Sequence, residues 1–199
     1  MKASVDPDES ENQLPRAPNS SADEILVNTL KLISEHGIPG VTLDMVAELS
    51  RVSKATIYRQ WPTREKLIIS AMSYLEVPTE VPDTGDIVQD LTILLRNLIE
   101  FLNKPDGGRV YSSFLNASVH DEKFADFRHE VTTKAVIPYT TVIKRGADRG
   151  DLKLGVPLRL AVDLLIAPFV YHRIATNSPS RVGDIDDVVR FFIRACAPD

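Results

Sequence analysis

The sequence is poor in the features that mark secreted, membrane-spanning or sheet-based proteins. Its one cysteine, Cys196, excludes a disulfide framework within the chain and a zinc site built on cysteine. No stretch approaches the ~20 uninterrupted apolar residues of a membrane-spanning helix, and residues 1–20 lack the apolar run of a signal peptide. Apolar and polar residues do not alternate over any useful length, so there is no place for a Rossmann or P-loop site. We therefore expect a soluble cytoplasmic protein of the all-α class.

One stretch, residues 42–66, organises the rest of the chain. Its apolar side chains do not fit one continuous helix, because Val52 falls between two helical runs, but they fit two short helices that cross around a shared core. Thr42 and Ser53 each stand immediately before a run, where a side-chain oxygen can accept from a backbone N–H. The second run ends before Pro62. This pattern predicts a helix-turn-helix with the apolar positions Val46, Ala47, Val52, Ile57 and Trp61.

Basic side chains are concentrated in the same stretch. The whole sequence carries a net charge of −5 at pH 7, but residues 51–66 hold five basic groups against one acid, a local balance of +4. Nucleic-acid affinity depends on a local basic footprint rather than on the total charge. The hydroxyl side chains of Ser53, Thr56 and Tyr58 lie between these charges. The composition is typical of a helix that enters the major groove and contacts phosphates on both sides.

The run S-R-V-S-K-A-T-I-Y-R-Q-W-P-T-R-E-K-L closely resembles the signature of the TetR family of one-component bacterial regulators, and the resemblance extends from Ser21 to Glu76. Arg51 and Ala55 stand where glycine is usual in that family. The turn position of Arg51 normally needs a positive φ, which glycine adopts freely and other residues adopt at a cost of ~1 kcal/mol. We expect Arg51 either to accept this strain or to reshape the turn.

Roles for individual residues follow from helix position and from the resemblance. Lys54 and Thr56 lie near the N-terminus of the predicted recognition helix, where base edges come within reach. Tyr58 and Lys66 resemble the family's phosphate-contacting pair, and Thr42 adds a phosphate hydrogen bond from the preceding helix. The predicted DNA-binding residues are Thr42, Arg51, Ser53, Lys54, Ala55, Thr56, Tyr58, Arg59 and Lys66.

Composition divides the chain into three parts. Residues 1–20 are polar and acidic with three prolines, and we expect a disordered tail. Residues 21–76 form the predicted three-helix DNA-binding domain, with its motif at 42–61. The run VPTEVPDTGD marks a boundary, after which 77–199 is predicted to be a larger helical bundle that binds an effector and dimerises. About nine helices are expected in total, including 21–37 with Ser21 and Gly37 as its caps, 63–76, 86–103, 106–119, 121–150 with a kink at Pro138, 157–176 and 185–195.

The helix at 157–176 is apolar over too much of its circumference to have one face free. A large exposed apolar surface requires a partner, and self-pairing about a two-fold axis is the commonest solution. The sequence K-R-G-A-D-R-G-D-L at 144–152, followed by A-V-D-L-L-I-A-P-F-V-Y-H-R at 161–173, resembles, less specifically, a common TetR-family C-terminal domain. In that family the last two helices of two subunits form a four-helix bundle. Here those helices correspond to 157–176 and 184–196. The expected partners are a second copy of the chain and double-stranded DNA with a near-palindromic operator.

The resemblance also implies that helices within 86–150 surround a small-molecule cavity. Apolar and aromatic residues dominate there, which favours a small hydrophobic or aromatic effector with few polar anchors. His172 and Arg173 are polar groups in an apolar helix, and the sequence leaves open whether they serve the cavity or the dimer interface. The candidate lining residues are Leu94, Leu98, Phe101, Tyr111, Phe114, Leu115, Phe127, Val131, Tyr139, Phe169, Tyr171 and His172.

Together these features favour a ligand-responsive repressor over an enzyme. His120, Asp121, Glu122 and His129 could suggest a metal or acid–base site, but the two histidines are nine residues apart and not at the i, i+4 spacing of ligands on one helix face. No catalytic residue, cofactor or metal is expected. The alternative is a helical protein-interaction or ligand-carrier module with a vestigial helix-turn-helix, which the basic residues of 51–66 oppose.

Overall fold

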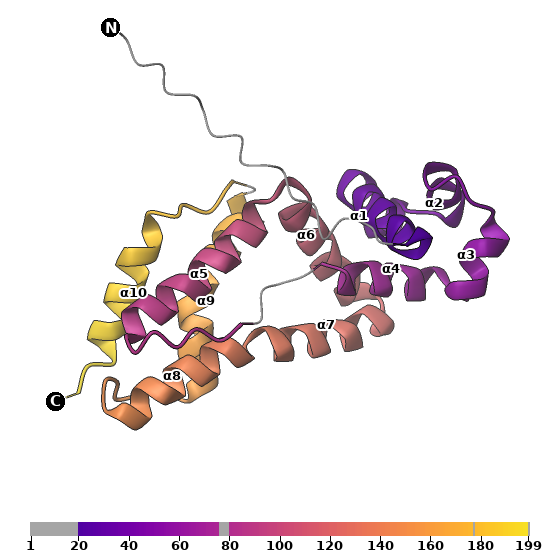
Figure 1. The fold of residues 1–199 in the computed structure, drawn as a ribbon. Helices are drawn as coiled ribbons and strands as arrows, with labels where there is room; N and C mark the ends of the chain where they lie inside the picture. The colour runs from indigo at the N-terminus through magenta and orange to yellow at the C-terminus, as the bar shows by residue number, and fades with distance from the viewer. Residues whose placement is uncertain (1–19, 76–79, 177, 199) are drawn as a thin grey trace, which may run out of the picture.

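The computed structural model describes residues 20–75, 80–176 and 178–198, and the regular structure in these ranges is all α-helical, as predicted. The predicted tail lies outside the described residues apart from Ser20, and so do residue 76, the last of the predicted DNA-binding domain, and residues 77–79 of the predicted boundary. No helix in the described part of the chain is long and apolar enough to cross a bilayer. The helices in Figure 1 are α1 (Ser21–Gly40), α2 (Leu43–Leu49), α3 (Lys54–Gln60), α4 (Arg64–Ser73), α5 (Ile87–Asn103), α6 (Pro105–His120), α7 (Glu122–Ala135), α8 (Ile137–Arg149), α9 (Leu158–Thr176) and α10 (Asp184–Ala195).

Helix α1 begins one residue earlier and ends later than the sequence predicts. Oγ of Ser20 accepts from the N–H of Asp23 at 3.2 Å, so Ser20 and not Ser21 is the N-cap. Gly37 has φ +70°, which interrupts the helix at the predicted end, but a further helical turn follows as far as Gly40. The N–H of Ile38 in that turn donates to Oγ of Ser113 on α6 at 2.7 Å. The kink therefore brings the end of α1 into direct contact with the C-terminal part of the chain.

The helices pack into two hydrophobic cores that do not coincide with the two halves of the sequence. The first core lies among α1, α2, α3 and α4 and also includes Val110, Phe114 and Ala117 of α6 and Phe124 of α7. The second core is built by α5, α8, α9 and α10. Figure 1 shows α2 and α3 at one end of the molecule, α6 and α7 in the middle, and α8 and α10 toward the other end. The N-terminal helices therefore rest on α6 and α7.

The stretch 121–150, predicted as one helix with a kink, is two helices. Helix α7 ends at Ala135 and α8 begins at Ile137, with Val136 between them. Proline has no backbone N–H to donate and is favoured in the first turn of a helix, where that N–H has no partner in any case. Pro138 takes this place in α8, so it starts a new helix here and accounts for one helix more than expected.

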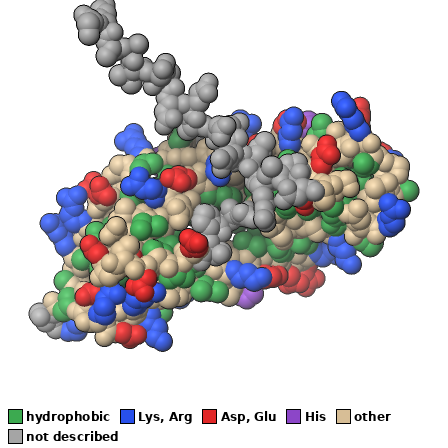
Figure 2. Space-filling view, viewed as in Figure 1, with side chains coloured by type: hydrophobic (Ala, Val, Ile, Leu, Met, Phe, Trp, Pro, Cys, Tyr) green, Lys and Arg blue, Asp and Glu red, His purple; other side chains and the backbone are tan. Residues whose placement is uncertain are grey.

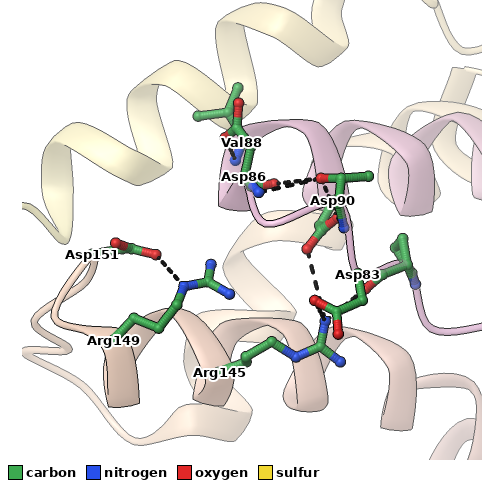
Figure 3. Close-up of polar contacts among 9 residues, drawn as sticks. Asp83, Asp86, Val88, Asp90, Arg145, Arg149 and Asp151 are labelled. Carbon is green, nitrogen blue, oxygen red and sulfur yellow. Dashed lines mark hydrogen bonds and ion pairs between the residues drawn. The ribbon is translucent and has the colours of Figure 1, made fainter.

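Polar contacts fasten the chain to α5 and α8 where it enters the second core (Figure 3). Thr84 donates from its backbone N and from Oγ1 to Oδ1 of Asp90, at 2.9 and 2.7 Å. Asp90 is 1% exposed, and its Oδ2 lies 3.9 Å from Nη1 of Arg145 on α8. Arg145 also pairs with Oδ1 of Asp83 at 2.7 Å and donates to the carbonyl of Pro82 at 2.9 Å. Because buried charges need paired and hydrogen-bonded partners, this cluster anchors the segment before α5.

Candidate functional site

The turn between α2 and α3 forms without glycine. Arg51 has a left-handed backbone conformation with φ 54°. Its N–H donates to the carbonyl of Glu48 at 3.2 Å, and the N–H of Val52 donates to the carbonyl of Ala47 at 3.0 Å. These are the two hydrogen bonds of a Schellman helix end, which normally has glycine at the left-handed position. Of the two outcomes expected from the sequence, Arg51 therefore accepts the strain and the turn keeps its shape.

A hydroxyl side chain caps the N-terminus of each of the helices α2, α3 and α4. Thr42, Ser53 and Thr63 precede α2, α3 and α4, and each hydroxyl oxygen accepts from the backbone N–H three residues later, at 3.3, 3.1 and 3.2 Å. Oγ of Ser53 also shares a 3.0 Å hydrogen bond with Oγ1 of Thr56. These caps fix the first turns of α3 and α4, which carry Lys54 and Lys66.

The nine predicted DNA-binding residues lie on the surface of this unit. All of them are exposed except Thr56, which is half-buried. Tyr58 is 50% exposed, which leaves a large amphipathic side chain available to a partner. Figure 2 shows Lys and Arg side chains at several points around the end of the molecule that α2 and α3 form. The fold thus gathers on neighbouring helices the hydroxyl and basic groups that the sequence spreads over residues 42–66.

Two of the five basic residues in 51–66, Lys54 and Arg64, have partners among the described residues. Nζ of Lys54 forms an ion pair with Asp44 of α2, and both side chains are exposed, so the pair contributes little stability. Nε of Arg64 donates to the carbonyl of Val41 at 2.6 Å, and the same guanidinium donates to the carbonyl of Ile38. Arg64 therefore fastens α4 to the end of α1, and the basic footprint open to DNA is smaller than the sequence suggests.

An apolar cavity of about 160 Å³ lies among helices α4 to α9. Its wall contains an aromatic pair, Phe114 and Phe127, whose ring centroids are 5.5 Å apart in an edge-to-face arrangement at 67°. Phe114 also belongs to the first core, so one side chain joins the cavity to the packing of the N-terminal helices. Eight of the twelve predicted residues line the cavity, namely Leu94, Leu98, Phe101, Tyr111, Phe114, Phe127, Val131 and Tyr139.

The other four predicted lining residues, Leu115, Phe169, Tyr171 and His172, are not part of the cavity wall. Phe169 is buried in the second core, and its carbonyl accepts from Oγ of Ser180 at 3.0 Å. Tyr171 is 72% exposed on α9. Nδ1 of His172 is buried and has no hydrogen-bond partner among the described residues. The prediction placed Phe169, Tyr171 and His172 together at the cavity, whereas the side chains of α9 divide among the cavity, the second core and the outer surface.

Several lining residues were missed by the sequence analysis. Met72 and Leu75 come from α4 and the residues just after it, which the predicted domain boundary separated from the cavity. Arg159 lines the cavity from the first turn of α9, a helix assigned to dimerisation. One signal was present, because Arg159, Ile166 and Val170 follow the spacing i, i+7, i+11 of a single helix face. The remaining missed residues are Asn97, Leu102, Thr132, Ala135, Val136 and Pro138.

Two tyrosines bring hydroxyl groups to the cavity wall. The Tyr139 hydroxyl donates to the carbonyl of Leu94 at 3.0 Å, which ties α8 to α5, and burial raises the pKa of Tyr139 well above its usual value. Burial also raises the pKa of Tyr111, and the Arg128 guanidinium partly offsets the effect. A phenol ordinarily titrates near pH 10, so both groups are neutral at physiological pH. The wall therefore carries hydroxyl dipoles and no phenolate charge.

The outer side of α9 and α10 exposes large apolar side chains. Leu160, Leu164 and Tyr171 follow one another along α9 at helical spacing, and Phe191 on α10 is 77% exposed. Helices α9 and α10 are in contact, and large apolar side chains exposed on neighbouring helices are typical of an interaction site. The face lies on the two helices that the sequence assigned to dimerisation.

Comparisons with known proteins cover both parts of the chain. Residues 25–71 match the family model described as bacterial regulatory proteins, tetR family, and residues 81–192 match the model described as tetracyclin repressor-like, C-terminal domain. YdeS of Bacillus subtilis (strain 168), described as an uncharacterized HTH-type transcriptional regulator, is 31% identical over 169 residues, which cover 83% of this chain and 84% of that protein. A DNA-binding transcriptional repressor, TetR of Mycobacteroides abscessus, is 28% identical over 180 residues, which cover 85% of this chain and 92% of that protein.

The fold is also that of solved regulators. The crystal structure of a TetR transcription regulator from Haloarcula marismortui matches with a TM-score of 0.75 at 18% sequence identity, covering 89% of this chain and 98% of that one. The family matches favour a DNA-binding regulator over an enzyme and do not favour an interaction module with a vestigial helix-turn-helix. The chain belongs to the TetR family of bacterial helix-turn-helix transcriptional regulators.

Proposed function

We propose that the protein represses transcription as a homodimer on a near-palindromic operator and that a small apolar effector releases it from DNA. Regulators of this family bind DNA and dimerise, and one relative is named a repressor. The observation that carries the effector-dependent part is the position of the cavity. Its wall includes Met72 of α4, the helix that follows the recognition helix directly.

The proposed DNA contacts combine base reading with phosphate binding. Lys54 and Thr56 in the first turn of α3 would meet base edges, with DNA displacing Asp44 from Lys54. Tyr58 and Lys66 would contact phosphates, and Thr42 would add a hydrogen bond from the start of α2. The exposure of these side chains, with only Thr56 half-buried, supports this assignment.

The proposed dimer interface is the exposed apolar face of α9 and α10. Burial of apolar surface contributes roughly 25 cal/mol per Å², so covering Leu164, Tyr171 and Phe191 in a symmetric contact would favour association. A two-fold dimer presents two α3 helices to DNA, separated by about one helical turn or a small multiple of it. An operator read by such a dimer is a near-palindrome.

The proposed coupling runs from the cavity to α3 through α4 and α6. Met72 and Phe114 line the cavity and also belong to the first core, which holds α1 and α4 against α6. An effector that pushes these side chains apart shifts α4, and only residues 61–63 separate α4 from α3. The spacing of the two α3 helices then departs from that of the grooves. Couplings of this kind are typically worth ~1–3 kcal/mol, or about 5- to 150-fold in affinity.

Selection of bound DNA from a random-sequence pool tests the proposal. The full-length protein at near-physiological salt should enrich a two-fold symmetric motif. Lys54→Ala should relax the preference at particular bases of each half-site, whereas the matched control Lys144→Ala, which removes an exposed lysine from α8, should leave the motif unchanged. The selection is repeated with protein refolded from denaturant, which strips any co-purified effector. If neither the purified nor the refolded protein enriches a symmetric motif, the proposal is wrong.

A further inference from the structure

We infer that the effector is a small apolar carboxylate, with its apolar body in the cavity and its carboxylate paired with Arg159. This inference rests on the proposed function, because it names the chemical class of molecule that the cavity binds. Three properties of the described cavity carry it: the sign of the charge on its wall, the hydrogen-bond donors that its wall has free, and its volume.

The charge on the wall is positive. Of the described residues that line the cavity, Arg159 is the one with a formal charge, and no Asp or Glu lines it. Nε of Arg159 donates to both carboxylate oxygens of Asp163, to Oδ1 at 3.0 Å and to Oδ2 at 3.2 Å. The Asp163 side chain is itself substantially exposed, so the pair lies where solvent screens it and the negative charge of Asp163 repels a second carboxylate only weakly.

The Arg159 guanidinium has N–H donors that Asp163 does not use. An arginine side chain offers five N–H donors, and Asp163 is hydrogen-bonded through Nε alone. Within the described ranges, the four N–H groups on Nη1 and Nη2 have no hydrogen-bond acceptor. The planar guanidinium can bind a carboxylate through two parallel N–H groups. A carboxylate at this place would therefore add hydrogen bonds without first breaking those to Asp163.

Exposure places the charged group at the edge of the cavity. The Arg159 side chain is 56% exposed, and the other described residues that line the cavity carry no formal charge. An anion bound there keeps part of its hydration, which avoids the large cost of burying a bare charge. The apolar part of the same molecule then extends inward toward Leu98, Phe114 and Phe127. The arrangement selects a molecule with a charge at one end only.

The volume of the cavity limits the size of the effector's apolar part. A dry cavity of about 150 Å³ holds a benzene-sized molecule, and this cavity measures about 160 Å³. Asn97 and Tyr111 make no hydrogen bond to other described residues, so each can meet one polar substituent. The expected effector is a ring or short chain with one carboxylate and no more than a few further polar groups.

Three probes of equal size separate charge from shape. Phenylacetate, phenylacetamide and 2-phenylethylammonium share a phenyl group and are negatively charged, neutral and positively charged, respectively. Titration calorimetry with the full-length protein should give phenylacetate about tenfold tighter binding than the amide, equivalent to about 1.4 kcal/mol, and the ammonium ion should bind more weakly than either. Equal binding of acid and amide would overturn the inference. Preference for the ammonium ion would also overturn it and would indicate recognition by the aromatic faces.

Variants locate the source of the preference. Arg159→Gln should remove the tenfold advantage of phenylacetate while leaving phenylacetamide binding unchanged, and Arg159→Lys should retain part of it. Asp163→Asn should strengthen phenylacetate binding, because it removes a negative charge that repels a second carboxylate at Arg159. The matched control is Arg149→Gln, which breaks a 2.8 Å pair with Asp151 away from the cavity wall. An anion preference that survives in Arg159→Gln would overturn the role of Arg159.

The same measurements distinguish failure of this inference from failure of the proposed function. If none of the three probes binds wild-type protein, the cavity is not a site for ring-sized molecules, and both the inference and the effector part of the proposal fail. Operator selection, which uses no effector, still tests DNA binding in that case. If the amide and the acid bind equally and both release DNA, the proposed function stands and the inference alone fails.

Discussion

Replacing Arg51 by glycine should stabilise the protein while weakening its binding to DNA. A residue other than glycine in the left-handed region costs about 1–2 kcal/mol, and Arg51 has φ 54°. Glycine removes this cost but has the larger conformational entropy in the unfolded chain, which offsets about 0.5–1 kcal/mol. The expected net gain is about 0.5–1 kcal/mol. For a chain of this length, each kcal/mol corresponds to about 2–4 °C in Tm.

Thermal unfolding followed by circular dichroism measures this gain, and two further variants isolate its cause. Arg51→Ala removes the same charge but keeps a Cβ, so it should retain the strain and show no gain. Arg51→Asn should fall between alanine and glycine, because asparagine tolerates the left-handed region better than most residues. If the glycine variant unfolds at the same temperature as the alanine variant, the turn stores no strain at Arg51 and the reasoning is wrong.

The weaker DNA binding expected of Arg51→Gly is measured by titration of an operator duplex. Loss of one phosphate contact should lower the slope of log affinity against log salt concentration by about 0.9. The alanine and glycine variants lose the same charge, so they should lose affinity to a similar extent despite their different stabilities. Unchanged affinity and salt slope in both variants would remove Arg51 from the proposed DNA-binding residues.

Three further predictions concern other contacts. Lys66→Ala should weaken binding to all DNA sequences alike and lower the salt slope by about one, whereas Lys144→Ala on α8 should change neither in the same titrations. Arg64→Met removes charged hydrogen bonds that hold α4 to the end of α1 and should cost about 1.5–3 kcal/mol in thermal unfolding. Leu164→Glu combined with Phe191→Glu places charges on the exposed face of α9 and α10 and should yield a monomer in sedimentation experiments; a dimer that persists would exclude this face as the interface.

Local signals in the sequence were sufficient to predict most helices. Caps at Thr42, Ser53 and Thr63 and the break at Pro62 define α2, α3 and the start of α4, and the structure has these helices where the signals place them. The same signals were less decisive at Pro138, since proline either bends a helix or begins one. Which of the two occurs depends on how α7 and α8 pack against the rest of the protein, and a local pattern does not contain that information.

The cavity was harder to predict because its wall comes from six helices distant in sequence. The predicted residues that do line the cavity come mainly from α5, α6 and α7. Helix α9 packs against α5, α6, α8 and α10, and an apolar pattern did not reveal that Phe169 belongs to the second core and that Tyr171 is exposed. The contribution of Met72 was also hidden, because it depends on α4 lying beside α7 and not on any property of α4 alone.

The position of α6 explains why two regions with different sequence signatures form one mechanical unit. One face of α6 supplies Phe114 to the cavity and to the first core. Its neighbour Ser113 accepts from the N–H of Ile38 at 2.7 Å, and the carbonyl of Ile38 in turn accepts from Arg64 on α4. Packed side chains and backbone hydrogen bonds therefore connect the cavity wall to both α1 and α4. Close-packed interiors transmit displacement and do not absorb it. A movement of side chains in the cavity wall can therefore reach α4, and through α4 the helix that precedes it, α3.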